Sequence, residues 1–245
     1  MKTIIIGDIH GRSIWKKIIQ QEDPDRIVFL GDYFDSFDVP GIDQIHNFKE
    51  IIDFKKSSDK EVILLVGNHD LHYMNIGETY SGFQAGLKFD ISSVLFENLS
   101  QLQMAFSFDR YLCTHAGVSH VWMENTFGVY GWDCWNLVEK INQLFVFRPK
   151  DFRFEGWDSY GNDVTQSPVW IRIPALLDSN KKRRADSNYW IKKNFVQIMG
   201  HTSVKDLNLV HMRKYMGGKY YMADALEIGK FLIDIDGKLS VGEIS

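Results

Sequence analysis

Five short segments of the sequence carry residue types that bind metal ions and transfer protons. Each combines Asp, His or Asn with a glycine, which lets the backbone turn tightly. Any one of them could be an ordinary turn or hold a hydrogen-bonded core histidine, but five in succession favour one shared site. They read Gly7-Asp8-Ile9-His10-Gly11, Gly31-Asp32-Tyr33-Phe34-Asp35, Gly67-Asn68-His69-Asp70, Thr114-His115-Ala116-Gly117 and Gly200-His201-Thr202.

Mixed oxygen and nitrogen donors define the chemistry that such a site could perform. Carboxylate, amide and imidazole ligands suit manganese, iron, zinc and nickel better than calcium. A carboxylate such as Asp32 can bridge two ions held about 3.5–4 Å apart, which together lower the pKa of a shared water and bind phosphate oxygens. The leaving alkoxide then needs a proton, for which an unligated histidine is the natural donor. The pattern therefore predicts hydrolysis of a phosphate ester.

Short apolar runs precede all five segments and are expected to position them. The runs are too short for helices and rich in β-branched or aromatic residues, so they predict buried strands. Apolar residues at helical spacing in segments 13–19 and 42–52 separate the first three, and alternating strands and helices indicate an α/β core. Ligands of such cores bind at the carboxyl ends of the strands. The expected strands cover residues 3–6, 27–30, 62–66, 111–113 and 195–199.

In the last part of the chain the apolar segments are spaced differently. Apolar segments 219–223, 230–235 and 238–241 follow one another closely, and Asp236-Gly237 is a hairpin turn signal. We therefore expect the second half to form a more antiparallel sheet that packs face to face with the first, with helices outside. Segments 73–83 and 156–167 are predicted loops.

Size and composition are those of one folded domain spanning residues 1–245. The 28 Lys and Arg against 32 Asp and Glu give a net charge of −4, which argues against a general nucleic-acid or membrane-surface binder. No apolar run approaches the roughly 18–20 residues of a membrane span. Two cysteines, Cys113 and Cys134, are too few for a disulfide framework, so we expect a cytoplasmic protein.

The five motifs resemble those of the calcineurin-like metallophosphoesterases, closest to the bacterial and phage branch that includes phosphoprotein phosphatases and symmetrical dinucleoside tetraphosphatases. The resemblance spans residues 8 to about 203. It implies a four-layer α/β/β/α sandwich of two mixed β-sheets flanked by helices. A Trp-rich helical insertion or lid is expected at about 119–165.

Position by position, the resemblance also implies roles for the motif residues. Asp32 would bridge both metals, Asp35 would hold His69, and His69 would protonate the leaving group. Asn68 and His69 would also contact the phosphate. The implied ligands are Asp8, His10 and Asp32 for the first metal, and Asp32, Asn68, His115 and His201 for the second.

Two further residues are similar to family positions. Arg172, in Pro168-Val169-Trp170-Ile171-Arg172, resembles a phosphate-binding arginine, with a surface ion pair as the alternative. Asp224 resembles an Asp that supports a ligand histidine, with an ordinary turn as the alternative.

The sequence also departs from the family pattern. Phosphoprotein phosphatases usually continue the second motif with Arg-Gly, whereas Ser36-Phe37 stand here, so one expected phosphate-binding arginine is absent. Many other members have a second histidine two residues after the last ligand, where this chain has Ser203. Symmetrical tetraphosphatases generally lack an acid at the position of Asp35. Substrate specificity therefore remains open.

Tryptophans are concentrated in one third of the chain. Packing within the core is the first expectation for them, and an aromatic face that covers the metals and stacks on a ring is the alternative. The basic run 181–184 is expected to be solvated, with a phosphate-rich partner as the alternative. The tryptophans are Trp122, Trp132, Trp135, Trp157 and Trp170.

We therefore predict a metal-dependent phosphoesterase that uses a metal-bridging hydroxide for in-line attack, with phosphomonoesters favoured. Two divalent ions are expected, manganese first, with iron, zinc, nickel or magnesium as alternatives. The substrate would be a phosphorylated small molecule, nucleotide or phosphoprotein; nucleic acid is not favoured and no membrane is involved. Alternatives are hydrolysis of nucleotide polyphosphates or phosphodiesters and, less favoured, a non-catalytic metal-binding scaffold.

Overall fold

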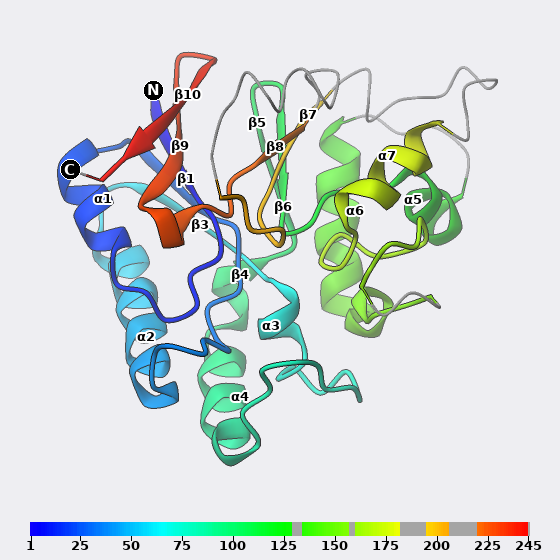
Figure 1. Ribbon diagram of the computed structural model, residues 1–245, viewed down its shortest axis with the longest axis horizontal. Coiled ribbons are helices and arrows are strands. Elements are labelled where there is room, and N and C mark those ends of the chain that lie inside the picture. The colour runs from blue at the N-terminus through cyan, green and yellow to red at the C-terminus, as the bar shows by residue number, and fades with distance from the viewer. Residues whose placement is uncertain (129–133, 157–159, 182–194, 206–219, 245) are drawn as a thin grey trace.

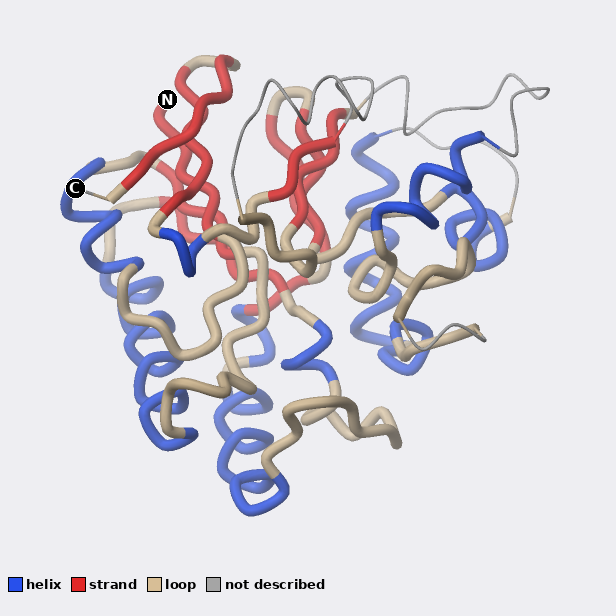
Figure 2. The backbone as a smooth tube through the Cα atoms, viewed as in Figure 1, coloured by secondary structure: helices blue, strands red, loops and turns tan. Residues whose placement is uncertain are grey.

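Two β-sheets form the centre of the protein (Figures 1 and 2). In the first sheet the strand order is β10-β9-β1-β2-β3-β4, and in the second it is β5-β6-β7-β8. The strands are β1 Lys2–Ile6, β2 Arg26–Phe29, β3 Glu61–Leu65, β4 Leu102–Gln103, β5 Ala105–Phe108, β6 Tyr111–Thr114, β7 Val196–Met199, β8 Tyr220–Met222, β9 Lys230–Ile235 and β10 Lys238–Glu243. The computed structural model describes residues 1–128, 134–156, 160–181, 195–205 and 220–244.

The strands of the first sheet are apolar on both faces because both faces are covered. In β1, Ile4 and Ile6 pack into the helix-side core, whereas Ile5 packs into the core between the sheets. In β2, Ile27 lies on the helix side and Val28 between the sheets. Continuous apolar runs are typical of parallel strands with two covered faces, and β1, β2 and β3 are indeed parallel.

Helices cover the outer face of each sheet. Helices α1 and α2 lie beside the first sheet, and α5, α6 and α7 lie beyond the second (Figure 1). The Trp15 indole Nε1 donates to Asn47 Oδ1 at 2.9 Å and joins α1 to α2. The described helices are α1 Trp15–Glu22, α2 Gly41–Ser57, α3 Asn68–Leu71, α4 Lys88–Glu97, α5 His120–Phe127, α6 Cys134–Phe147 and α7 Ile173–Lys181, with 3-10 turns at Ala85–Leu87, Leu99–Gln101, Pro149–Phe152 and Leu226–Ile228.

The predicted α/β core is confirmed: all five expected strands and both expected helices are present. The expectation of a more antiparallel second sheet from the C-terminal segments is wrong. In the second sheet only β5 and β6 are antiparallel, and β6, β7 and β8 run parallel. The β9–β10 hairpin instead extends the first sheet through antiparallel pairing of β9 with β1.

Burial explains the position of the hairpin. Phe231 packs into the helix-side core and Leu232 packs into the core between the sheets. A strand with apolar side chains on both faces needs cover on both faces, and the edge beside β1 provides it. The hairpin turn at Asp236 and Gly237 is confirmed, since both residues have positive φ angles of 52° and 81°.

The segment between the fourth and fifth motifs forms helices in the described residues. Helix α6 lies against β5, where Asn142 Oδ1 accepts hydrogen bonds from the backbone N–H groups of Met104 and Ala105 at 2.9 Å each. Trp122 in α5 is buried, as expected for core packing. The side chains of Trp132, Trp135 and Trp157 and the basic run 181–184 lie outside the described residues.

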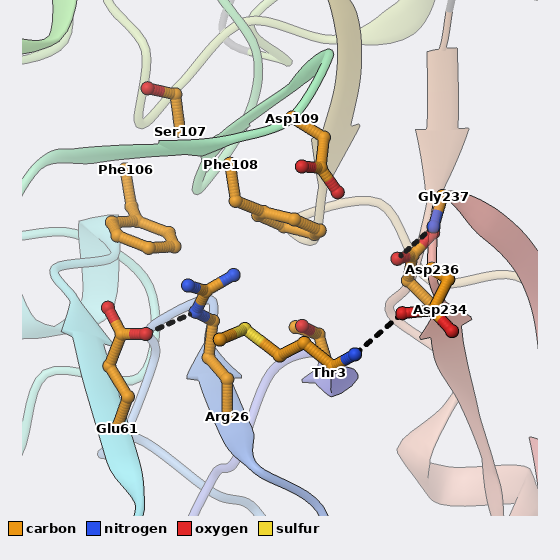
Figure 3. Close-up of a pocket in the computed structure, with 11 residues that line it drawn as sticks. Thr3, Arg26, Glu61, Phe106, Ser107, Phe108, Asp109, Asp234, Asp236 and Gly237 are labelled. Carbon is orange, nitrogen blue, oxygen red and sulfur yellow. Dashed lines mark hydrogen bonds and ion pairs between the residues drawn. The ribbon is translucent and has the colours of Figure 1, made fainter.

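A cavity of about 620 Å³ lies at the amino-terminal ends of β1, β2 and β3, lined by polar side chains of the first sheet and by Phe106 and Phe108 of β5 (Figure 3). Thr3, Arg26 and Glu61 are register neighbours on β1, β2 and β3. Arg26 Nε donates to Glu61 at 2.6 Å, and the guanidinium lies 5.4 and 5.3 Å from the ring centroids of Phe106 and Phe108. The motif residues follow the opposite ends of these strands.

Within the described residues, no helix combines the length and apolar character that a membrane crossing requires.

Candidate metal centre

The five motifs converge where the carboxyl ends of β1, β2, β3, β6 and β7 meet. One ligand atom each from Asp8, His10 and Asp32 lies within 4.8 Å of the other two, and the same holds for Asp32, His115 and His201. Asp32 therefore belongs to both groups. Two groups that share one carboxylate are the arrangement in which a pair of ions can be held close together.

The backbone adopts an unusual conformation at these residues. His10, Asp32, Asp35 and His201 have φ angles of 43°, 52°, 62° and 61°, in the left-handed region that side chains with a Cβ disfavour. Such a residue costs about 1–3 kcal/mol and persists only where its surroundings hold it. Here the His10 N–H donates to Asp32 O at 2.7 Å, and the His201 N–H donates to Asp8 Oδ1 at 2.9 Å.

Asp70 fixes the second and third motifs to each other. Its buried carboxylate accepts hydrogen bonds from the backbone N–H groups of Asp32, Tyr33 and Gly67 at 2.9, 2.7 and 2.8 Å. The sequence displays Asp70 within the third motif, but no role follows for it from the sequence. Its function in the fold is to hold the loop that presents Asp32.

Two glycines allow the carboxylates to approach the backbone of neighbouring motifs. A Cβ on Gly67 would lie 2.0 Å from Asp32 Oδ1, and a Cβ on Gly200 would lie 2.2 Å from Asp8 Oδ1. Any larger residue would displace these oxygens. The glycines of the third and fifth motifs are thus required by close packing against the two carboxylates.

Three histidines have one ring nitrogen bound to a backbone carbonyl. His10 Nδ1 donates to Phe34 O at 2.6 Å, and His115 Nδ1 donates to Leu30 O at 2.8 Å. His201 Nε2 donates to Trp170 O at 3.1 Å. In a neutral ring, each bond fixes the tautomer and leaves the other nitrogen with a lone pair, as in histidines that bind metals. Burial lowers the pKa of His10 and of His201, which keeps both rings neutral.

Several atoms with lone pairs converge at His115 Nε2, the ring nitrogen that is not bound to a backbone carbonyl. His115 Nε2 lies 2.9 Å from Asn68 Oδ1 and 3.3 Å from Asp32 Oδ2, and all three residues are buried. Burial opposes a charge on His115, yet Asp32 and Asp8 raise its pKa to about 10. A proton or a metal cation between these three atoms would relieve the repulsion between their lone pairs.

The pKa values of the neighbouring carboxylates also indicate a site that favours a positive charge. Burial and the neighbouring Asp224 raise the pKa of Asp8 well above its usual value, and burial and Asp32 raise that of Asp224 to about 6. The pKa of Asp32 falls well below its usual value despite burial, because His115 and His69 stabilise its charge. This donor set, with its excess of buried negative charge, fits divalent cations.

Beside the two groups, Asp35 organises a hydrogen-bonded network. His69 Nδ1 donates to Asp35 Oδ2 at 2.9 Å, and His72 Nε2 lies 2.6 Å from the same oxygen. The Tyr73 hydroxyl donates to Asp35 Oδ1 at 2.6 Å. The Tyr80 N–H donates to His72 Nδ1 at 3.2 Å, so the proton of a neutral His72 ring is on Nε2 and faces Asp35.

The expected pairing of Asp35 with His69 is thus present in the geometry. Burial opposes a charge on His69, but Asp32 and Asp35 raise its pKa, which favours the protonated ring near neutral pH. No role followed for His72 from the sequence, although its spacing of three residues from His69 is that of neighbours on one helical turn. Asp35, His69 and His72 also satisfy the spacing of a metal site, and within this trio His69 is hydrogen-bonded to Asp35.

Arg172 reaches the same region from the start of α7. It lines a cavity of about 380 Å³ together with Asn68 and His69. Its Nη1 donates to His201 O at 2.6 Å and to Thr202 Oγ1 at 3.2 Å, so the arginine is held against the fifth motif. In the described residues, the surface ion pair considered as an alternative for Arg172 is not observed.

Known proteins show what the chain is similar to. It matches the family described as Calcineurin-like phosphoesterase over residues 1–230, whereas no curated protein matches it significantly in sequence. A crystal structure of a mutant cold-active protein tyrosine phosphatase is similar in fold, with 17% identity, a TM-score of 0.58, and coverage of 100% of this chain and 80% of that chain.

Two further solved structures align over the whole chain with lower scores. They are a metallophosphoesterase from Sphaerobacter thermophilus, with 10% identity, 89% of that chain covered and a TM-score of 0.49, and the E. coli phosphoesterase Yfce, with 11% identity, 100% of that chain covered and a TM-score of 0.37. The likeness to the tyrosine phosphatase, at 17% identity, shows the fold alone.

Replacement of Gly67 by alanine should weaken metal binding about 10- to 100-fold, because the new methyl group would push Asp32 Oδ1 aside. Titration of the metal-free protein with Mn²⁺ measures the affinity, and circular dichroism checks the fold. Gly86→Ala is the matched control, since a Cβ added at Gly86 would meet nothing within 4 Å. If both variants bound Mn²⁺ with equal affinity, metal binding would not depend on the present position of Asp32 Oδ1.

Proposed function

Because the chain belongs to the calcineurin-like phosphoesterase family, we propose that it is a dinuclear-metal phosphomonoesterase. The family and the Asp/His groups establish a metal-dependent hydrolase as the class of enzyme. The observation that carries the proposal is the sharing of Asp32 between the Asp8–His10 group and the His115–His201 group. A shared carboxylate supports two ions acting on one phosphate.

In this proposal the first metal is held by Asp8, His10 and Asp32. The second is held by Asp32, Asn68, His115 and His201, which matches the convergence of lone pairs around His115. When bound, the two cations would lower the pKa of a water molecule and neutralise phosphate oxygens. Manganese is proposed first among the ions that this combination of oxygen and nitrogen donors suits, ahead of iron, zinc and nickel.

His69 supplies the proton for the leaving group. Its Nδ1 is bound to Asp35, so Nε2 is the nitrogen that can donate to the ester oxygen. Asp35 has a second task, because it stabilises the protonated ring and orients it. In this proposed pair, His69 is the proton donor and Asp35 is the residue that positions it.

Three residues are proposed to hold the phosphate. Arg172 brings a guanidinium into the cavity that also exposes Asn68 and His69. A guanidinium can bind two oxygens of one phosphate at once. This fixed charge supports a terminal phosphate group as the reacting group, and hence a monoester of a protein or a small molecule.

A substrate panel tests the proposed reaction. With added Mn²⁺, p-nitrophenyl phosphate should be hydrolysed at least about 10-fold faster than bis(p-nitrophenyl) phosphate or a dinucleoside tetraphosphate, because a monoester offers the terminal phosphate that Arg172 binds. Chelation of the metal should abolish turnover. Faster cleavage of the diester or the dinucleotide would replace the monoesterase proposal by one of those two activities.

Substitution of His69 by alanine should lower kcat about 10²–10⁴-fold while metal content stays close to that of the unchanged protein, since the ring donates a proton and does not hold an ion. Initial rates and elemental analysis of the purified protein provide both measurements. His46→Ala, an exposed histidine on α2, is the control and should retain full activity. A fully active H69A enzyme would remove His69 from the reaction.

The variant Asp32→Asn should lose most of both bound ions, because one negative charge is proposed to serve two cations. The metal-to-protein ratio after gel filtration measures this loss. Asp53→Asn, on the exposed face of α2, should bind metal normally. Two ions retained at full turnover in D32N would refute the shared carboxylate.

A further inference from the structure

An aromatic pocket adjoins the proposed reaction centre. The cavity of about 380 Å³ has Asn68, His69 and Arg172 on its polar side. Its remaining described lining consists of four aromatic side chains and one serine, contributed by segments distant from one another in the sequence. These are Tyr80 and Ser81 from the loop after α3, Phe154 and Tyr160 from the segment after α6, and Trp170 from the turn before α7.

The Trp170 ring packs edge to face against two of the other aromatic rings. The ring centroids of Tyr80 and Trp170 are 4.3 Å apart at 65°, and those of Phe154 and Trp170 are 5.2 Å apart at 89°. The Tyr80 hydroxyl donates to Glu78 and accepts a hydrogen bond from the Phe154 N–H. These contacts fix the rings, so the wall is built before any ligand enters.

The aromatic wall is attached to the reaction centre at two points. The Trp170 ring lies 6.0 Å from that of His201, and the Trp170 carbonyl accepts a hydrogen bond from His201 Nε2. The Tyr80 ring stacks on His72 at 5.9 Å and 10°, and His72 contacts the same Asp35 oxygen as His69. The wall therefore lies beside both a proposed metal ligand and the proposed proton donor.

We propose that this pocket receives the leaving group and that the preferred substrates are aryl phosphates, in which an aromatic ring is bonded directly to the ester oxygen. The inference rests on the proposed phosphomonoesterase reaction. In it, a water oxygen forms a bond to phosphorus and the P–O(aryl) bond breaks. The electron pair stays on the aryl oxygen, which takes the proton from His69 Nε2, and the products are inorganic phosphate and a phenol.

Geometry favours an aryl group over a sugar or an alkyl chain. The group that departs with the proton from His69 must lie beside His69, in the cavity whose other described lining residues are Tyr80, Ser81, Phe154, Tyr160 and Trp170 besides the proposed phosphate ligands. Aromatic rings prefer the edge-to-face contacts that these walls offer. A ribose in the same place would carry hydroxyl groups into a lining dominated by ring carbon, and buried hydroxyls without partners are unfavourable.

The test compares two esters of similar size in the metal-loaded enzyme, phenyl phosphate and cyclohexyl phosphate. Intrinsic reactivity differs between them, so the measured quantity is the ratio of their kcat/KM values in each variant. Trp170→Leu and Phe154→Leu should each lower the phenyl-to-cyclohexyl ratio about 2- to 10-fold, the scale of one lost aromatic contact. The inhibition constant of inorganic phosphate should change less than about twofold, since the proposed phosphate contacts are Arg172, Asn68 and His69 and not the aromatic rings.

Phe89→Leu is the matched control, because Phe89 is 84% exposed on α4 and outside the pocket. An unchanged ratio in the two pocket variants, or equal losses for both esters, would overturn the aryl proposal. A phosphotyrosyl peptide and phenyl phosphate then distinguish the source of the ring. Faster turnover of the peptide assigns the ring to a protein side chain, and the reverse assigns it to a free aryl ester; both results keep the aryl preference.

Binding measurements test the proposed aromatic pocket independently of the proposed reaction. If the enzyme hydrolyses neither ester, the proposed function is wrong, and calorimetry with phenylphosphonate and methylphosphonate still tests the pocket. Tighter binding of phenylphosphonate by about 10-fold, lost in W170L, supports the aromatic site. Equal binding of the two phosphonates by the unchanged protein would refute it.

Discussion

Burial of Asp8 and Asp32 next to each other is the constraint on which this structure depends. A carboxylate removed from water is strongly unfavourable unless donors or cations surround it. The protein supplies some donors from its own backbone: the His201 N–H binds Asp8, and the His69 N–H binds Asp32 at 2.9 Å each. The negative charge that remains is what makes the site a place for divalent ions.

The same constraint explains features that are otherwise unrelated. Glycines at 67 and 200 allow backbone to touch the carboxylates, and left-handed residues such as Asp32 and His201 turn the chain sharply at the strand ends. These conformations are unfavourable by themselves. Apolar strands covered on both faces offset that strain, because their burial stabilises the sheets from which the motifs project.

Much of the candidate site could be predicted because it depends on local pattern and on one rule of topology. Each motif follows a strand, and parallel strands bring their carboxyl ends to one edge, so Asp8, Asp32 and Asn68 had to meet. The roles of Asp70 and His72 could not be predicted, since they depend on loop conformations. The hairpin's place beside β1 was also missed, because turn signals identify a hairpin but not its neighbour in a sheet.

The aromatic wall illustrates both what the sequence could predict and what depends on the folded structure. The sequence left Trp170 open between packing and a face over the metals, since its partners Tyr80 and Phe154 lie in distant segments. In the structure, Asp35 links that wall to the acid: one carboxylate oxygen contacts both His69 and His72, and His72 stacks on Tyr80. Position 36 holds a serine where phosphoprotein phosphatases usually have a phosphate-binding arginine. We therefore expect substrate selection to depend less on charges around the phosphate and more on the shape and chemistry of the leaving group. In the proposed reaction, the leaving group is the part of the substrate nearest Asp35 and its partners.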